Sequence, residues 1–269
     1  MERRIAYAEH LADQRTKAAP AWSSPVELAA DLGLTLDDWQ RDVLTSTATQ
    51  IVMLAGRQTG KTTCAVLLGL YEALCKPGSL TLVLSPGERQ SGRLFRTLLK
   101  AYRHLGYPVA ADVENRLSLE LANGASVHAM PGNEARVRGF SGVTLLLEDE
   151  AALVPDALYQ ACRPMTAVSG GRVVLMSTPR GRRGHFYNEF VHGGPDWFRV
   201  SITASACARI PTTWLAEERD RIGSFWYDQE YGCLFLDDET QVFASELIDA
   251  AVRPDFKSFG LPRFGGQAV

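Results

Sequence analysis

The sequence predicts an α/β protein with a mainly parallel central sheet, flanked by helices, and an antiparallel hairpin at the sheet edge. Short apolar runs alternate with longer amphipathic stretches, which is the pattern of strands that helices cover on both faces. Two alternating runs joined by an Asn-Gly turn predict the hairpin. We expect strands at 50–55, 80–85, 143–148, 172–177 and 198–202, hairpin strands at 116–121 and 126–130, and covering helices at 61–75, 87–105, 155–163 and 212–232.

The composition is that of a globular protein. With 269 residues, of which 46% are apolar, the chain can bury the core of one large domain or two small ones. Five cysteines without a C-x-x-C pair argue against a disulfide framework and a zinc site, and favour a reducing compartment. No apolar segment approaches the ~20 residues that cross a bilayer, and the N-terminus lacks the apolar core of a signal peptide. We therefore expect a soluble chain that stays inside the cell.

The charge balance gives no global argument for nucleic-acid binding, because the formal net charge is -3. Any such argument has to be local. Taken alone, each basic cluster of the sequence fits a solvated loop better than a phosphate contact. The clusters are Arg180, Arg182, Arg183 and His185 in one stretch, and Arg136 and Arg138 in another.

The stretch "MLAGRQTGKTT" ends an apolar run, turns through two glycines and opens a predicted helix. Ala55 to Thr62 matches the phosphate-loop pattern of a small residue, four variable positions, Gly, Lys and Ser or Thr. Glycines let backbone N–H groups turn toward phosphate oxygens, Lys61 reaches the outer phosphates, and the Thr62 hydroxyl can ligate Mg²⁺. The alternative is a Gly-rich strand-to-helix turn with a surface lysine, and the flanking strand and helix make it the weaker interpretation.

A second motif is "VTLLLEDEAA", in which a predicted buried strand ends in Glu148, Asp149 and Glu150. Carboxylates at the end of a core strand lose hydration unless a cation compensates them. A Mg²⁺ ion held by one carboxylate, with a neighbouring carboxylate directing water at the terminal phosphate, provides that compensation. The alternative, a solvated acidic loop, is weaker downstream of a phosphate loop. Together the two motifs predict an NTPase with a hydrolytic glutamate rather than a kinase or a GTPase.

A third motif, "VVLMSTP", is a predicted strand that ends in Ser177 and Thr178, next in sequence after the acidic strand. In helicase-like ATPases a short hydroxyl motif of this kind lies beside the hydrolytic carboxylate and senses the γ-phosphate. Ser-Thr-Pro alone is ordinary strand-to-loop sequence, so its position in the order of motifs gives it weight.

In order and spacing, these motifs resemble the ATPase domain of viral large terminases, the motors that pump DNA into empty capsids. The resemblance extends from Leu36 to Phe243, nearly the whole chain. It implies a P-loop NTPase of the ASCE, RecA-like class that hydrolyses ATP with Mg²⁺. The stretches that carry it are "LDDWQRDVL", "GRQTGKTT", "RVRGFSGVTLLLEDEAALVPDALY", "LMSTPRGRRGHFYNEF" and "DQEYGCLFLDD".

The resemblance also implies roles for individual residues. Trp39 and Gln40 resemble the Q motif on the adenine side of the nucleotide. Gln40 would read the adenine edge, and Trp39 would either belong to this motif or pack in the core. Arg57 contacts the γ-phosphate, and Arg138, preferred to Arg136, completes the nucleotide site of a neighbouring subunit. The residues implied to bind nucleotide are Gln40, Gly56, Arg57, Gln58, Thr59, Gly60, Lys61, Thr62, Thr63, Ser177 and Thr178; the catalytic residues are Lys61, Arg57, Arg138 and Glu150; and Thr62 and Asp149 hold Mg²⁺.

The partners follow from the same resemblance. They are double-stranded DNA, a small terminase subunit, and further copies of the chain in a ring on the portal of a procapsid, with no membrane. The process belongs to the cytoplasm of the host cell. Arg180, Arg182 and Arg183 directly follow the hydroxyl motif, so we expect them to contact DNA phosphates.

Two departures from the family pattern matter. The residue before the Asp-Glu pair is usually apolar but is Glu148 here, which leaves two registers open; we expect Asp149 as metal ligand with Glu150 catalytic, because "DEAA" followed by "VP" fits the family. Large terminases usually carry a second, RNase H-like nuclease domain, and this chain ends about where that domain begins. We therefore expect no DNA cleavage, with a helical extension at 1–35, an ATPase domain at 36–243 and a tail at 244–269.

Two other functions stay open at this point. A helicase-like ATPase that remodels nucleic acid shares these motifs but needs a second RecA-like domain. A catalytically silent terminase remnant, acting as an assembly adaptor, is suggested by the short C-terminus, which reflects truncation, natural shortening or a split enzyme.

Overall fold

The structure, a computed structural model, describes residues 22–131 and 139–237. The described residues up to Leu236 belong to one structural unit. At its centre is an eight-stranded sheet in the order β3-β4-β5-β2-β6-β7-β1-β8. The strands are β1 (Gln50–Ala55), β2 (Leu80–Ser85), β3 (Ala111–Glu114), β4 (Ser118–Leu121), β5 (Ser126–Pro131), β6 (Leu145–Asp149), β7 (Arg172–Ser177) and β8 (Trp197–Ile202).

The sheet from β5 to β8 is parallel, as the continuous apolar runs predict. Every residue of β6 is buried, and β1, β2 and β7 are buried after their first residue, because helices cover both faces of these strands. Parallel strands place their carboxyl ends at one edge, where α/β proteins bind ligands. Ala55, Asp149 and Ser177 end their strands at that edge.

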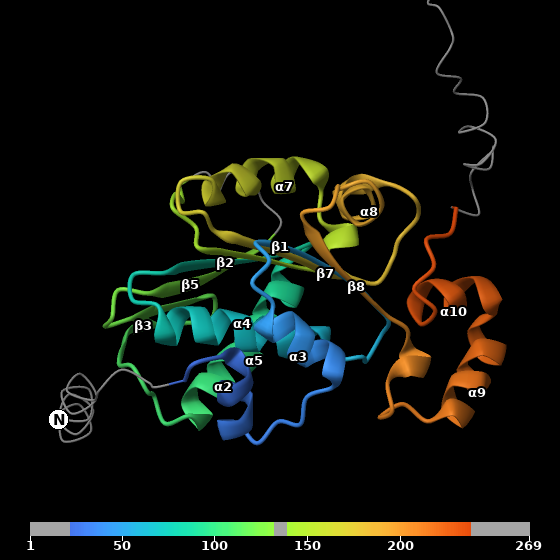
Figure 1. Cartoon of the computed structure of the whole chain (residues 1–269), viewed down its shortest axis with the longest axis horizontal. Coiled ribbons are helices and arrows are strands. Elements are labelled where there is room, and N and C mark those ends of the chain that lie inside the picture. Colours follow the sequence, from blue (N-terminus) through green and yellow to red (C-terminus); the bar gives the residue numbers. More distant parts are fainter. Residues whose placement is uncertain (1–21, 132–138, 238–269) are drawn as a thin grey trace, which may run out of the picture. The chain divides into compact units, whose positions relative to one another are not determined.

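The helices form a layer on each face of the sheet (Figure 1). One layer holds α2 (Pro25–Asp31), α3 (Asp38–Thr45), α4 (Lys61–Cys75) and α5 (Glu88–His104), and the other holds α7 (Asp156–Cys162) and α8 (Gly184–Val191). Alternate residues of β1 serve the two cores: Ile51 and Met53 pack with the first layer, and Val52 and Leu54 with the second. Burying each of these side chains contributes about 1.5–3 kcal/mol.

The antiparallel edge matches the predicted hairpin. β4 and β5 pair antiparallel through a turn at Gly124, which has φ +80°. β5 also pairs parallel with β2, and so joins the hairpin to the main sheet. The short strand β3 adds an outer strand that the sequence did not predict.

The predicted helix at 212–232 is two helices. α9 (Thr212–Ile222) and α10 (Ser224–Glu230) meet at Gly223, whose φ of +81° interrupts the helix and which occupies the position where helices commonly end in glycine. β1, β2, β7 and α4 have the predicted bounds, and the other predicted elements differ from the structure by one or two residues at their ends. Within residues 22–131 and 139–237, no helix combines the length and apolar character needed to span a bilayer.

Candidate active site

The phosphate-loop sequence forms the turn between β1 and α4. β1 ends at Ala55, and α4 begins at Lys61 with Gly60 as its N-cap. Gly60 has φ +107°, and a Cβ atom there would lie 2.6 Å from Gln40 Nε2, so the position accommodates glycine alone. The first N–H groups of a helix have no intrahelical acceptor and attract anions, which makes the start of α4 suited to phosphate.

A cavity of about 420 Å³ lies against this loop. The loop, the start of α4, one side of α5 and the acidic end of β6 enclose it. The structure therefore brings the phosphate loop and two of the predicted acids, which are far apart in sequence, into a single site. The lining residues are Gly56, Arg57, Gln58, Thr59, Gly60, Lys61, Thr62, Thr63, Gln90, Arg93, Leu94, Thr97, Asp149 and Glu150.

Lys61 is buried within the loop. Its Nζ donates to the carbonyl oxygens of Ala55 at 2.6 Å and Gly56 at 3.4 Å. Burial lowers the pKa of the ammonium group, and the nearby carboxylates of Glu150 and Asp149 oppose that shift. Phosphate oxygens are stronger hydrogen-bond acceptors for an ammonium group than these neutral carbonyls. A bound phosphate can therefore replace the two carbonyl oxygens as the partner of Lys61 Nζ.

Strand alternation assigns the two acids of β6, Glu148 and Asp149, to opposite faces of the sheet. Leu145 and Leu147 pack with the layer of α4 and α5, whereas Leu146 packs with the layer of α7 and α8. Asp149 therefore lies on the face of the phosphate loop, in the cavity lining. Glu148 lies on the opposite face with 0% exposure. The register that makes Glu148 the metal ligand would need this side chain in the cavity, so the geometry favours Asp149.

Asp149 and Glu150 concentrate negative charge at the cavity. Burial and the neighbouring Glu150 carboxylate raise the pKa of Asp149 to about 6, although Lys61 and Arg93 act against the rise. Glu150 has φ 54°, in the left-handed region that few non-glycine residues occupy. The Thr62 hydroxyl lines the same cavity, and hydroxyl and carboxylate oxygens are ligands that Mg²⁺ prefers. The residues present therefore fit a magnesium ion.

Gln40 and Arg209 donate side-chain hydrogen bonds to carbonyl oxygens of the phosphate loop. The Gln40 side chain is 2% exposed; its Oε1 accepts from Asp37 N–H at 2.9 Å and its Nε2 donates to Gly60 O at 3.2 Å. Arg209 donates to Thr59 O at 2.8 Å and forms an ion pair with Asp37 at 2.5 Å. Both ends of the Gln40 amide thus have partners in the loop region, and its adenine-reading role stays a prediction.

Arg57 joins the loop to the C-terminal helix α10. Its Nε donates to Glu230 Oε2 at 2.7 Å, and its backbone N–H donates to Glu230 O at 2.9 Å. The hydrogen bond to Glu230 raises the pKa of the guanidinium group. The Arg57 side chain lines the cavity and is 60% exposed. Its contact with a γ-phosphate stays a prediction.

Helix α5 contributes cavity residues that the sequence did not single out. Gln90, Arg93 and Thr97 lie three and four positions apart, which places them on one helix face. Arg93 is near enough to Asp149 to oppose the rise in its pKa. α5 follows β2, and β2 pairs with β6. The closeness of these α5 residues to the acids of β6 can therefore be predicted only when the strand order is known.

The other predicted residues that the structure describes do not line this cavity. Ser177 and Thr178 are buried at the end of β7, 1% and 9% exposed. Trp39 is partly buried against the core and donates to Asp37 Oδ2 at 3.2 Å. The basic cluster Arg180, Arg182 and Arg183 is exposed between β7 and α8. Arg136 and Arg138 lie outside the described residues.

The parallel sheet, the phosphate loop after β1 and the acids at the end of β6 together form the arrangement of the P-loop NTPase fold. The comparisons with known proteins lead to the large terminases. The chain is 25% identical over 235 residues to the terminase large subunit of Thermus phage G20c, and equally to that of Thermus virus P23-45. No protein-family model matches the chain.

Solved structures agree with this assignment of the fold. The large terminase ATPase domain of Thermus phage P74-26 superimposes with a TM-score of 0.69 at 23% identity, covering 78% of this chain and 98% of that one. The large terminase of another thermophilic bacteriophage, in complex with ATP-gamma-S, has a TM-score of 0.63 at 14% identity, covering 75% of this chain and 53% of that one. The resemblance to the ATPase domain of large terminases is therefore confirmed.

The match covers only part of the length of these relatives. The match covers 74% of this chain but 48% of each Thermus phage protein, so the chain spans about half the length of the curated relatives it matches.

Proposed function

We propose that this chain is the ATP-hydrolysing motor domain of a terminase large subunit, which drives double-stranded viral DNA into a procapsid. The observation that carries the proposal is the shared cavity. It joins the phosphate loop to Asp149 and Glu150 in a fold that the chain shares with terminase ATPase domains.

The triphosphate would lie along the phosphate loop. Backbone N–H groups of the loop and the start of α4 would bind its oxygens, and Lys61 would leave its carbonyl partners for the outer phosphates. Thr62 and Asp149 would hold a magnesium ion, which would neutralise charge that develops on the phosphates. Arg57 and Arg93, which line the cavity from two sides, would add positive charge to the terminal phosphate.

Hydrolysis would depend on Glu150. A glutamate at this place can orient water toward the γ-phosphate, and Glu150 is the partly exposed acid of the cavity, whereas Asp149 is buried. The hydroxyls of Ser177 and Thr178, at the end of the strand next to β6, would couple the state of the nucleotide to movement of the basic loop that follows them.

The complete motor would contain further copies and partners. Arg138 would enter the cavity of a neighbouring subunit, which requires a head-to-tail contact of the kind that closes into a ring. Such a ring would sit on the procapsid portal and receive DNA through the small terminase subunit. The exposed Arg180, Arg182 and Arg183 would face the DNA phosphates.

Steady-state ATP hydrolysis, measured against protein concentration with and without linear duplex DNA, tests the proposal. Wild-type turnover should rise more than linearly with protein, increase with DNA, and disappear in Lys61→Ala and Glu150→Ala. Turnover equal to both variants would instead support the silent adaptor. Unwinding of a tailed duplex by the chain would support the helicase-like alternative.

Mixing variants tests the ring separately. Arg138→Ala lacks the arginine that a subunit supplies, and Glu150→Ala lacks the glutamate that it uses itself. Mixed rings contain some interfaces with both groups intact, so the mixture should regain activity that neither variant has alone. No rescue in mixtures shown to assemble would contradict the role of Arg138.

A further inference from the structure

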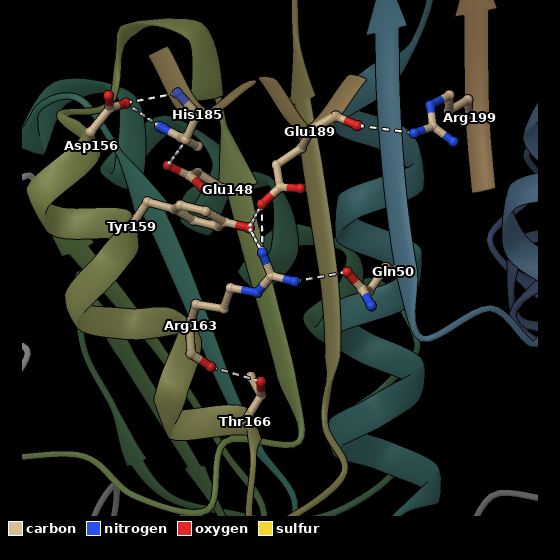
Figure 2. Close-up of polar contacts among 9 residues, drawn as sticks. All are labelled: Gln50, Glu148, Asp156, Tyr159, Arg163, Thr166, His185, Glu189 and Arg199. Carbon is tan, nitrogen blue, oxygen red and sulfur yellow. Dashed lines mark hydrogen bonds and ion pairs between the residues drawn. The ribbon is translucent and has the colours of Figure 1, made fainter. Parts of the chain in front are cut away.

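A cluster of polar side chains joins the end of β6 to α7 and α8, on the face of the sheet that these two helices cover (Figure 2). Glu148 and His185 are buried in it, whereas the Asp156 side chain is 51% exposed. His185 of α8 is at its centre, 7% exposed. Its Nε2 is 3.0 Å from Glu148 Oε1 at the end of β6, and its Nδ1 is 2.8 Å from Asp156 Oδ1 at the start of α7. Its backbone N–H also donates to Asp156 Oδ1 at 2.8 Å. One residue thus joins two elements of the chain.

These two contacts lie at the two ends of one segment. Residues 148–156 leave β6, pass through Glu150 and the 3₁₀ turn Ala151–Leu153, and enter α7. Glu150, the proposed catalytic residue, has φ 54° within this segment. A residue in such a sparsely populated conformation persists only where its surroundings hold it. His185 is the side chain that bridges the segment from end to end.

The surroundings of His185 fix its orientation. Its ring stacks on Tyr159, with centroids 4.3 Å apart and planes 16° from parallel. The Tyr159 hydroxyl bonds to Glu189 Oε1 at 2.9 Å, and Glu189 also pairs with Arg163. The stacked Tyr159 ring therefore restricts tilting of the imidazole plane.

The backbone before His185 is adapted to the same contact. Gly184 has φ +79°, and a Cβ atom there would lie 3.3 Å from Asp156 Oδ1, close to the bond that the next residue makes. His185 is the second residue of α8, and Gly184 alone separates it from the exposed basic loop of Arg180, Arg182 and Arg183. His185 therefore connects residues 148–156, which contain Glu150, to the basic loop that we expect to contact DNA.

We propose that His185 is a positioning residue, which clamps residues 148–156 at both ends and so holds Glu150 in its catalytic geometry. The proposal rests on the proposed ATPase function for its catalytic part. Its structural part, that His185 holds the segment, stands on the contacts alone.

Removing one partner alone does not test the clamp cleanly. His185→Phe leaves the Glu148 carboxylate buried without its partner, and Glu148 Oε2 has none among the described residues even in the wild type. Such a buried charge destabilises the whole fold. The double variant Glu148→Leu with His185→Phe replaces the pair by apolar side chains of similar size, which restores packing without restoring the clamp.

The matched control is Arg163→Met. It removes the ion pair with Glu189 and the bond to Gln50 Oε1 in the same cluster, but it touches neither end of residues 148–156. Three quantities are measured for each chain: the melting temperature, the hydrogen exchange of peptides that cover 148–156, and the kcat and KM for ATP. The amides of Leu153 and Val154, which bond within the segment, report its local order.

In the double variant we expect a melting temperature near that of the wild type, with exchange of Leu153 and Val154 faster by about 10-fold or more. We expect kcat to fall about 10-fold or more with KM within about 3-fold, because Glu150 acts in the reaction rather than in binding. Arg163→Met should keep wild-type exchange in this segment and wild-type kcat.

Unchanged exchange of the segment in the double variant would overturn the clamp, and unchanged kcat would overturn its part in catalysis. If the wild type itself turns over no faster than Glu150→Ala, the proposed ATPase function fails, and the exchange rates still decide whether His185 holds the segment.

Discussion

Replacing Asp149 with asparagine should stabilise the nucleotide-free chain while it abolishes ATP hydrolysis. The carboxyl group is 9% exposed, and burial with repulsion from Glu150 raises its pKa from 3.8 to about 6. One pKa unit corresponds to about 1.36 kcal/mol, so ionising this group costs the folded chain about 3 kcal/mol. An amide of the same shape carries no charge and avoids that cost.

The effect has a defined pH dependence. Because the folded-state pKa of Asp149 lies above the unfolded value, the destabilisation by this group is absent below about pH 4 and grows progressively as the pH rises to about 6. Above that pH the destabilisation is complete. The gain from Asp149→Asn should therefore be small near pH 4 and reach its full size at pH 8.

Thermal unfolding in EDTA without nucleotide measures this gain. For a chain of this size, 1 kcal/mol shifts the melting temperature by about 2–4 °C, so Asp149→Asn should melt about 6–12 °C higher at pH 8. The control is Asp220→Asn, the same substitution at an exposed position of α9, which should change little. An unchanged melting temperature at pH 8, or an equal gain at both pH values, would refute the reasoning.

Three further substitutions test the loop and its neighbours. Gly60→Ala forces a side chain at φ +107° against Gln40 and should cost about 1–3 kcal/mol in urea unfolding, with weaker ATP binding; a wild-type midpoint would contradict this. Arg93→Ala should lower kcat/KM for ATP about 10- to 100-fold, because a hydrogen bond to a charged group is worth about 1.5–3 kcal/mol; unchanged kinetics would exclude Arg93 from the site. Glu230→Gln should lower the KM for ATP by weakening the hold on Arg57, and the stability should change by less than about 1 kcal/mol because the Arg57 side chain is 60% exposed; a higher KM would show that the pair positions Arg57 instead.

The parts of the fold that the sequence predicts well are those with a local cause. The strands at 50–55, 80–85 and 172–177 have the predicted bounds, because each is an apolar run that ends at a loop. β3 was missed because its four residues, Ala111–Glu114, include two acids and form an outer strand with little apolar pattern. The break at Gly223 was missed because the amphipathic pattern continues on both sides of it.

The same distinction applies to the site. The phosphate loop and the acids of β6 are contiguous motifs, and the structure brings them to one cavity as expected. The α5 residues depend on the strand order. The contacts of Glu148 with His185 and of Arg57 with Glu230 join residues 37 and 173 positions apart, which no local pattern predicts.

Equilibrium binding of a slowly hydrolysed ATP analogue with Mg²⁺ tests the central claim, that the 420 Å³ cavity is a nucleotide site, most directly. The wild type and Asp220→Asn should bind saturably with equal affinity. Lys61→Ala should bind about 10-fold more weakly or worse, because it lacks a charged contact to the phosphates. Equal binding by Lys61→Ala and wild type, or no binding by either, would contradict the account.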